Sequence, residues 1–190
     1  KLIAFLVDDY GTIRISSSEA LNELSKLDHK ISENRFNKYD DIASTEDLEE
    51  LFKVLKSVKD KNGKHAVFTP MTVVANPNFK VIEESDFKSY AYENFYQTLD
   101  NRKDGDGIKK FWKQGIEEGI FVPEFHGREH LNVRFWMSFL NKNDENVLTA
   151  FKNQSIGINP KHNNRIGYMA AFDLVEQNHI QELNEIATDG

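Results

Sequence analysis

The sequence contains 190 residues, of which 39% are hydrophobic, and this length and composition suit a single folded domain with a packed apolar core. A net charge of −7 at pH 7 argues against binding to nucleic acid or to an anionic membrane surface, because both require a clustered basic face. Cysteine is absent, which excludes disulfide bonds, thiolate metal ligands and a cysteine nucleophile, so any metal must be bound by histidine or carboxylate side chains.

The chain begins with an apolar run of strand length, residues 2–7, that leads directly into Asp8 and Asp9. A continuous apolar run predicts a strand covered on both faces, as in a parallel sheet. The run is too short for a signal peptide, which favours a cytoplasmic location, although a chain that lacks an initiator Met leaves the compartment open. No later run approaches the roughly 20 apolar residues that a membrane span needs.

Helical and strand patterns then alternate along the first half of the chain. Leucines at helical spacing follow Ser16-Ser-Ser-Glu19, and Ser44 with Asp47 resembles a capping box that opens a helix over residues 45–58. Residues 65–69 and 72–75 predict a second buried strand, interrupted at Pro70. The polar, aromatic-rich stretch 80–106 is weakly periodic and is expected to be an excursion between core elements.

The second half continues the alternation and sets the fold class. The expected elements are helices over residues 108–118, 132–140, 144–153 and 174–186, and strands over 120–125 and 166–172. Strands that alternate with helices predict an α/β domain with a parallel sheet, spanning residues 1–190 as one unit.

Two groups of potential metal ligands follow predicted strands. Asp8 and Asp9 follow the first strand, and His126 and His130 follow the third. Because the carboxyl ends of parallel strands meet at one edge of a sheet, these side chains are expected to lie together. Histidines four residues apart on one helical turn point the same way, and two histidines with one carboxylate leave positions open for a water that attacks a substrate.

Each group also has an ordinary structural interpretation. The histidines could lie on an unremarkable helix, and one aspartate could cap a helix while the other is solvated. Their coincidence at one sheet edge favours a divalent metal site, zinc above all, held by Asp9, His126 and His130. Thr69 and Asn76 flank the end of the predicted second strand and are expected to line the adjacent cleft.

Both groups of side chains together resemble the first two motifs of the polysaccharide deacetylase family, which has the NodB-homology domain. The resemblance lies in Phe5-Leu-Val-Asp-Asp9 and Phe125-His-Gly-Arg-Glu-His130, and it extends to residues 7–14, 72–77 and 126–132, which are similar to an uncharacterised bacterial branch. It implies a distorted (β/α) barrel, open on one side, that removes acetyl groups from a saccharide. It also implies metal ligation by Asp9, His126 and His130, with Asp8 as the general base and a backbone N–H near Tyr10 at the oxyanion.

The chain departs from the family pattern in its later motifs. An Arg-x-Pro stretch, an Asp-containing strand and a Leu-x-His are not found, so no general acid is assigned, and Gly127 replaces the usual Ser or Thr after the first histidine. About four strand–helix units are too few to close a barrel. The sequence is therefore expected to represent the N-terminal two-thirds of a longer, here incomplete, barrel domain.

Two other functions remain open at this stage. His126-x-x-Glu129-His130 fits the motif of inverted zinc metallopeptidases, with Glu129 as base, although Pro123 and Gly127 suit the required helix poorly. Alternatively, the domain binds a saccharide or a partner chain without catalysis and keeps the metal site as a relic. The sequence does not indicate an oligomeric state.

Overall fold

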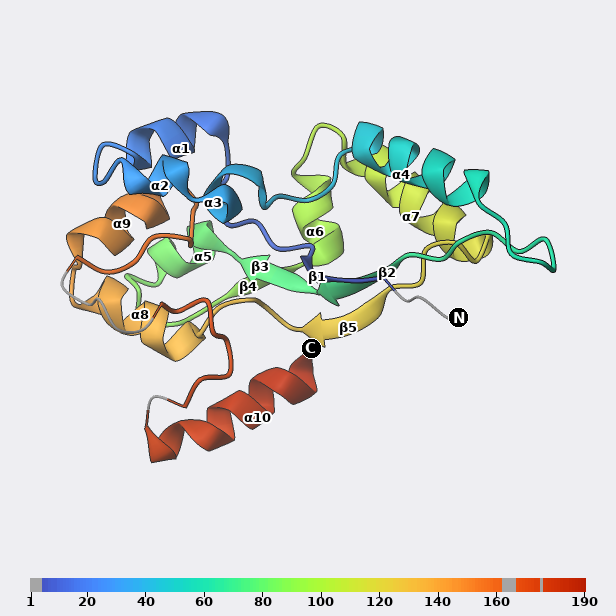
Figure 1. Cartoon of the computed structure of the whole chain (residues 1–190). Coiled ribbons are helices and arrows are strands. Elements are labelled where there is room, and N and C mark those ends of the chain that lie inside the picture. Colours follow the sequence, from blue (N-terminus) through green and yellow to red (C-terminus); the bar gives the residue numbers. More distant parts are fainter. Residues whose placement is uncertain (1–4, 162–166, 175) are drawn as a thin grey trace.

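The computed structural model describes residues 5–161, 167–174 and 176–190, and it has a mixed α/β fold. Three strands form a parallel sheet in the order β1-β2-β5, with β1 at Leu6–Tyr10, β2 at Thr69–Val73 and β5 at Glu124–Gly127 (Figure 1). The strands are therefore neighbours in chain order, as the alternating pattern predicted. The described residues contain no closed barrel, so the sheet is open on both sides.

The register of the sheet brings three strand ends to one level. Tyr10 pairs with Thr72, Thr72 pairs with Phe125, and Val73 pairs with Gly127. The strand β2 runs straight through Pro70, which is paired with Val7, so the predicted interruption at this proline is wrong. The expected meeting of strand ends at one edge is confirmed.

The first strand is less covered than the sequence predicted. Phe5 is 67% exposed, Leu6 61% and Val7 38%, so the described part of the run is not buried on both faces. In the part of the chain that the structure describes, β1 is an edge strand beside β2, so its side chains have strand neighbours on one side alone. Residues 2–4 of the predicted strand lie outside the described residues.

The stretch expected to be an irregular excursion contains regular elements. Strand β3 (Ala75–Pro77) pairs antiparallel with β4 (Tyr92–Asn94), and the helices α5 (Phe79–Glu84) and α6 (Phe95–Asp100) each follow one of them. Asn78 and Asn94 cap these helices. Elements of three to six residues are too short to produce a measurable hydrophobic period, which is why the pattern missed them.

The remaining helices are α1 (Ser18–Leu24), α2 (Lys30–Glu33), α3 (Arg35–Tyr39), α4 (Thr45–Ser57), α7 (Gly105–Glu117), α8 (Val133–Asn141), α9 (Glu145–Lys152), the 3-10 turn η1 (Gln177–His179) and α10 (Ile180–Asp189). Among them, α1, α4, α7, α8, α9 and α10 were expected from the sequence, whereas α2, α3 and η1 were not. The capping box of Ser44 and Asp47 is confirmed at the start of α4. Gly119, with φ +68°, follows the C-cap of α7 in the left-handed conformation that glycine commonly takes after a helix.

In Figure 1, α4, α6 and α7 lie above the sheet and α10 lies below it. Helices α4 and α7 lie side by side and, with α6, enclose an aromatic core that includes Phe52, Trp112 and Phe121 (Figure 1). A second core around Trp136 and Phe151 joins α5, α8, α9 and α10. Both cores are assembled at the ends of the strands, which holds the strand-end loops in fixed positions.

The last part of the chain differs most from the prediction. Residues 167–174 form turns and not a strand, while Ile166 lies outside the described residues. Tyr168 is buried and its carbonyl accepts a 2.6 Å hydrogen bond from the Asn132 N–H, so it supports the start of α8 instead of extending the sheet. The final helix begins at Ile180, six residues later than expected. In the part of the chain that the structure describes, none of the helices has the length and apolar character of a membrane span.

Candidate metal centre

Asp9 lies at the end of β1, where the backbone leaves regular strand geometry. The pairing with β2 shifts register between Val7 and Tyr10, and Asp9 itself has φ +62°. This left-handed conformation costs an ordinary residue about 1–2 kcal/mol, although Asp tolerates it better than most. Strain of this kind is concentrated at functional sites, where it fixes the direction of a side chain.

A tight turn over residues 9–12 follows and fixes the position of Asp9 at the end of the sheet. The Thr12 N–H donates to the Asp9 carbonyl over 3.2 Å, and Gly11 has φ +99°. A Cβ atom on Gly11 would lie 2.5 Å from the Val73 carbonyl oxygen, so the turn passes directly over the end of β2. This position therefore requires glycine both for its φ and for its space.

The two histidines do not lie on one helical turn, as the spacing suggested. His126 belongs to β5, His130 lies in a bend after the strand, and α8 begins only at Val133. The two rings nevertheless face each other, with centroids 6.2 Å apart and an angle of 17° between planes. A strand end followed by a bend thus brings residues i and i+4 together as effectively as a helix would.

The expected ligands Asp9, His126 and His130 converge. The Nε2 atoms of His126 and His130 lie 3.3 and 3.0 Å from Asp9 Oδ1, and one ligand atom from each residue lies within 4.8 Å of the other two. The side chains of His126 and Asp9 are each 32% exposed and that of His130 is 25% exposed, so the group is open to solvent on one side. A substrate can therefore reach it.

The group fits a tetrahedral divalent ion. Two ligands at 2.0–2.1 Å from zinc lie about 3.4 Å apart, close to the separations between Asp9 Oδ1 and the two Nε2 atoms. Within the described residues, Asp9 Oδ1 is buried and accepts no hydrogen bond, although both Nε2 atoms lie within 3.3 Å of it. A buried carboxylate oxygen without a donor is costly unless a cation satisfies it.

Asp8, the expected base, precedes Asp9 in β1 and is not one of the three converging ligands. It is exposed at the end of β1 and makes no hydrogen bond or ion pair with any residue that the structure describes. Its carboxylate is therefore not committed to a structural role.

The Tyr10 side chain lies in the aromatic core, so the substrate contact expected at this residue concerns its backbone. Its ring packs at 5.7 Å from Phe68, 6.0 Å from Phe121 and 6.2 Å from Trp112 in the aromatic core. Burial, with a smaller contribution from the Asp47 carboxylate, raises the Tyr10 pKa to about 12. Next to Asp9, Tyr10 contributes its backbone, which is paired with Thr72 of β2.

Thr69 and Asn76 are not brought into the ligand group. Thr69 opens β2 beside Leu6, at the end of the strand opposite to Val73. Asn76 is buried, and its amide donates to the Gly11 carbonyl and accepts from the Ile13 N–H. It holds the loop after β1 in place, on the wall of a cavity of about 480 Å³ whose lining excludes the three ligands.

An ion pair that the sequence did not reveal lies near the ligands. Arg14 Nε is 3.2 Å from Asp40 Oδ2, in the segment between α3 and α4. The pKa of the Asp40 carboxyl is raised, mainly by burial and also by the negative charge of Asp9. The positive charges of Arg14 and His130 act in the opposite direction. Asp40 follows a five-residue helix, and nothing in its spacing marks it as a neighbour of Asp9.

A second unforeseen feature lies between the two histidines. Arg128 binds Glu129 through two hydrogen bonds of 2.6 and 2.7 Å, and the Glu129 side chain is 1% exposed. Glu129 is therefore buried against Arg128 and is not part of the ligand group. This arrangement gives no support to the metallopeptidase interpretation, which needs Glu129 at the metal.

Comparisons of the chain with protein-family models, curated proteins and solved structures found no match.

Proposed function

We propose that the chain is a metal-dependent hydrolase that removes an acetyl group from a saccharide. The observation that supports this most is the convergence of Asp9 Oδ1, His126 Nε2 and His130 Nε2, with the carboxylate oxygen buried and without a hydrogen-bond donor in the described residues. We further propose that the sequential sheet β1-β2-β5 corresponds to the first strands of a distorted barrel of the NodB type.

Zinc is the ion that this donor set favours. Two imidazole nitrogens and one carboxylate oxygen, without thiolate, are typical of catalytic zinc sites that keep one position for water. An ion bound there supplies Lewis acidity and lowers the pKa of its water to about 7. Three protein ligands that are partly exposed suit this arrangement, because a fourth position then faces solvent.

The protein residues next to the ligands supply the remaining functions in this proposal. Asp8 is exposed and uncommitted, and it takes the proton from the attacking water as general base. The backbone N–H of Tyr10 donates to the carbonyl oxygen of the acetyl group as negative charge develops there. No residue is assigned as the general acid. Thr69, at the opposite end of β2, is given no role in substrate binding.

Metal binding is tested by calorimetric titration of Zn²⁺ into the wild-type chain and two histidine variants. His126→Gln should weaken binding by more than the roughly 10–100-fold that changes to supporting residues cost. His29→Gln is the matched control, because the His29 side chain is 77% exposed and, within the described residues, its ion pair is with Asp28 and not with a carboxylate of the site. Equal affinity of the His126 variant and the wild type would disprove the site.

Turnover is tested by the release of acetate from N- and O-acetylated saccharides. Asp8→Asn should keep the wild-type Zn²⁺ affinity and lose roughly 10²–10⁴-fold in rate, as expected for removal of a general base. Full activity of this variant would remove Asp8 from the mechanism. Zinc binding without acetate release by the wild type would contradict the enzyme and favour a saccharide-binding domain.

A further inference from the structure

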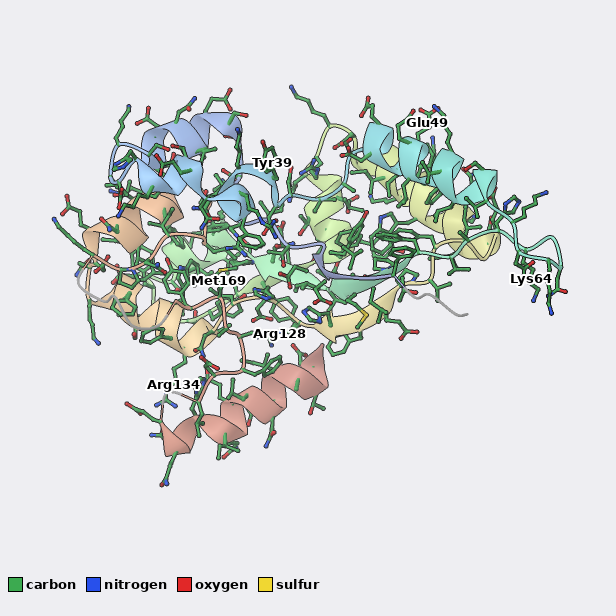
Figure 2. The ribbon with its side chains drawn as sticks, viewed as in Figure 1. Tyr39, Glu49, Lys64, Arg128, Arg134 and Met169 are labelled. Atoms are coloured by element: carbon green, nitrogen blue, oxygen red, sulfur yellow. The ribbon has the colours of Figure 1, made fainter. Side chains whose placement is uncertain are left out.

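The segment that carries the two histidines is joined to the C-terminal helix by a chain of charged groups. Arg128 Nη1 donates to Asp189 Oδ2 over 2.8 Å, while Nε and Nη2 of the same guanidinium bind Glu129. Figure 2 shows Arg128 between the sheet and α10. One side chain thus connects residues 126–130 with the last turn of a helix that lies some sixty positions later.

The geometry around Arg128 is enforced from several directions. Its guanidinium lies 4.5 Å from the Tyr92 ring centroid, and the Tyr92 hydroxyl donates to the same Asp189 oxygen over 2.7 Å. The backbone carbonyl of Arg128 accepts a 2.7 Å hydrogen bond from the Ala75 N–H. These contacts hold the Arg128 side chain in one position.

The histidines need such support from the backbone. Metal-binding histidines are ordinarily oriented by a hydrogen bond from the second ring nitrogen. The Nδ1 atom of His130 is buried and has no hydrogen-bond partner among the described residues. The direction of this ring is therefore determined by the backbone of the bend, and Arg128 and Glu129 are the residues that shape that bend.

We infer that Arg128 and Asp189 are positioning residues of the metal centre, and that docking of α10 and binding of the metal favour each other. The inference rests on the proposed metal site and extends it to the end of the chain. Because coupling between two binding events is reciprocal, the metal should stabilise the docked helix to the same degree that the docked helix raises metal affinity.

The test compares Zn²⁺ affinity in three variants of the chain. Asp189→Asn keeps the shape of the side chain and removes its charge, and Arg128→Lys keeps the charge and loses the two-pronged contact with Glu129. Each should weaken Zn²⁺ binding about tenfold, as changes to groups that support a ligand do. Glu185→Gln is the control on the same helix, because Glu185 bonds only Gln181 there, and it should bind Zn²⁺ like the wild type.

Two further readouts separate positioning from a loss of stability. The visible absorption of bound Co²⁺ should change in Asp189→Asn, because it reports ligand geometry, and remain unchanged in Glu185→Gln. Amide exchange in α10 should slow on Zn²⁺ addition in the wild type and not in Asp189→Asn. If both Asp189→Asn and Arg128→Lys bind Zn²⁺ with the wild-type affinity and give the wild-type Co²⁺ spectrum, this inference is overturned and the proposed function is not. If the wild-type chain binds no Zn²⁺, the proposed function and this inference are both wrong.

Discussion

Asp9 and Gly11 both adopt positive φ angles, of +62° and +99°, and they reach this conformation at different cost. Glycine enters it freely, whereas an aspartate must be held there by its surroundings. The hydrogen bond from Thr12 N–H to the Asp9 carbonyl closes the turn that contains both residues. The ligand and the turn are therefore one local structure, and a change at Gly11 should affect Asp9.

Replacing Gly11 by Ala tests this coupling. The substitution combines the left-handed penalty of about 1–2 kcal/mol with an overlap with the Val73 carbonyl that costs about 1–3 kcal/mol more, so equilibrium unfolding in urea should show a loss of about 3 kcal/mol. Gly63→Ala is the matched control, since Gly63 has φ +80° and no atom within 4 Å of a new Cβ. Equal losses in the two variants would show that close packing at Gly11 contributes nothing.

Burial of the Tyr10 hydroxyl predicts a loss of stability in alkali. The folded protein keeps this proton up to a pKa of about 12, while the unfolded chain loses it near 10, so stability is fully present below pH 10 and falls as pH rises from 10 to 12. The difference amounts to about 2–3 kcal/mol. Tyr10→Phe should flatten the decline of the unfolding free energy in this pH range by that amount.

A control for the Tyr10 experiment is available in the same chain. The Tyr96 side chain is 64% exposed, and Tyr96→Phe should leave the alkaline decline as steep as in the wild type. The opposite result, a flattened decline in Tyr96→Phe and none in Tyr10→Phe, contradicts the packing of Tyr10 in the aromatic core.

Among the elements, α4 illustrates how local signals determine a helix. The Asp47 N–H donates to Ser44 Oγ, and the Ser44 N–H donates to the Asp47 carboxylate. Ser44→Ala removes the cap and should lower the unfolding free energy by about 1 kcal/mol, measured by denaturant titration. Ser57→Ala, at the other end of α4, removes only a bond to the Val54 carbonyl and should cost less. A larger loss at Ser57 would show that the capping box does not stabilise the helix.

Local signals were sufficient for the long helices and insufficient for the short elements. The capping box at Ser44 indicates the start of α4 and Gly119 the end of α7, because each signal depends on neighbours in the sequence, whereas α7 begins three residues earlier than predicted. The segment at residues 167–172 is apolar enough to predict a strand, yet Tyr168 is buried against α8 and pairs with no strand in the described residues. Its surroundings come from residues 36 positions away, which no local period encodes.

For the whole molecule, metal binding should increase stability by mass action. If Zn²⁺ binds the folded state alone, a concentration of one hundred times Kd adds about 2.7 kcal/mol. For a chain of this size the melting temperature should rise by about 5–10 °C, measured by differential scanning calorimetry. Asp9→Asn should melt at one temperature with and without Zn²⁺. An identical rise in this variant would place the binding elsewhere.

The long-range part of the candidate site was predictable from the sequence only where topology determined it. That Asp9 and the histidines meet follows from parallel strands in chain order, and it is confirmed by the pairing of β1, β2 and β5. The ion pair of Arg14 with Asp40, in contrast, depends on how the segment between α3 and α4 folds back, and it has no periodic or compositional signal.

The left-handed backbone at Asp9 also limits how this chain can diverge. Glutamate offers the same carboxylate, but its longer side chain lacks the short local contacts that make this conformation tolerable for Asp. Its oxygen would also extend one carbon further toward His126 and His130, which already lie 3.3 and 3.0 Å from the aspartate oxygen. Asparagine would keep the backbone and lose the charge. Substitution at this position is thus restricted by conformation before metal chemistry selects among the remaining residues, and aspartate alone meets both requirements.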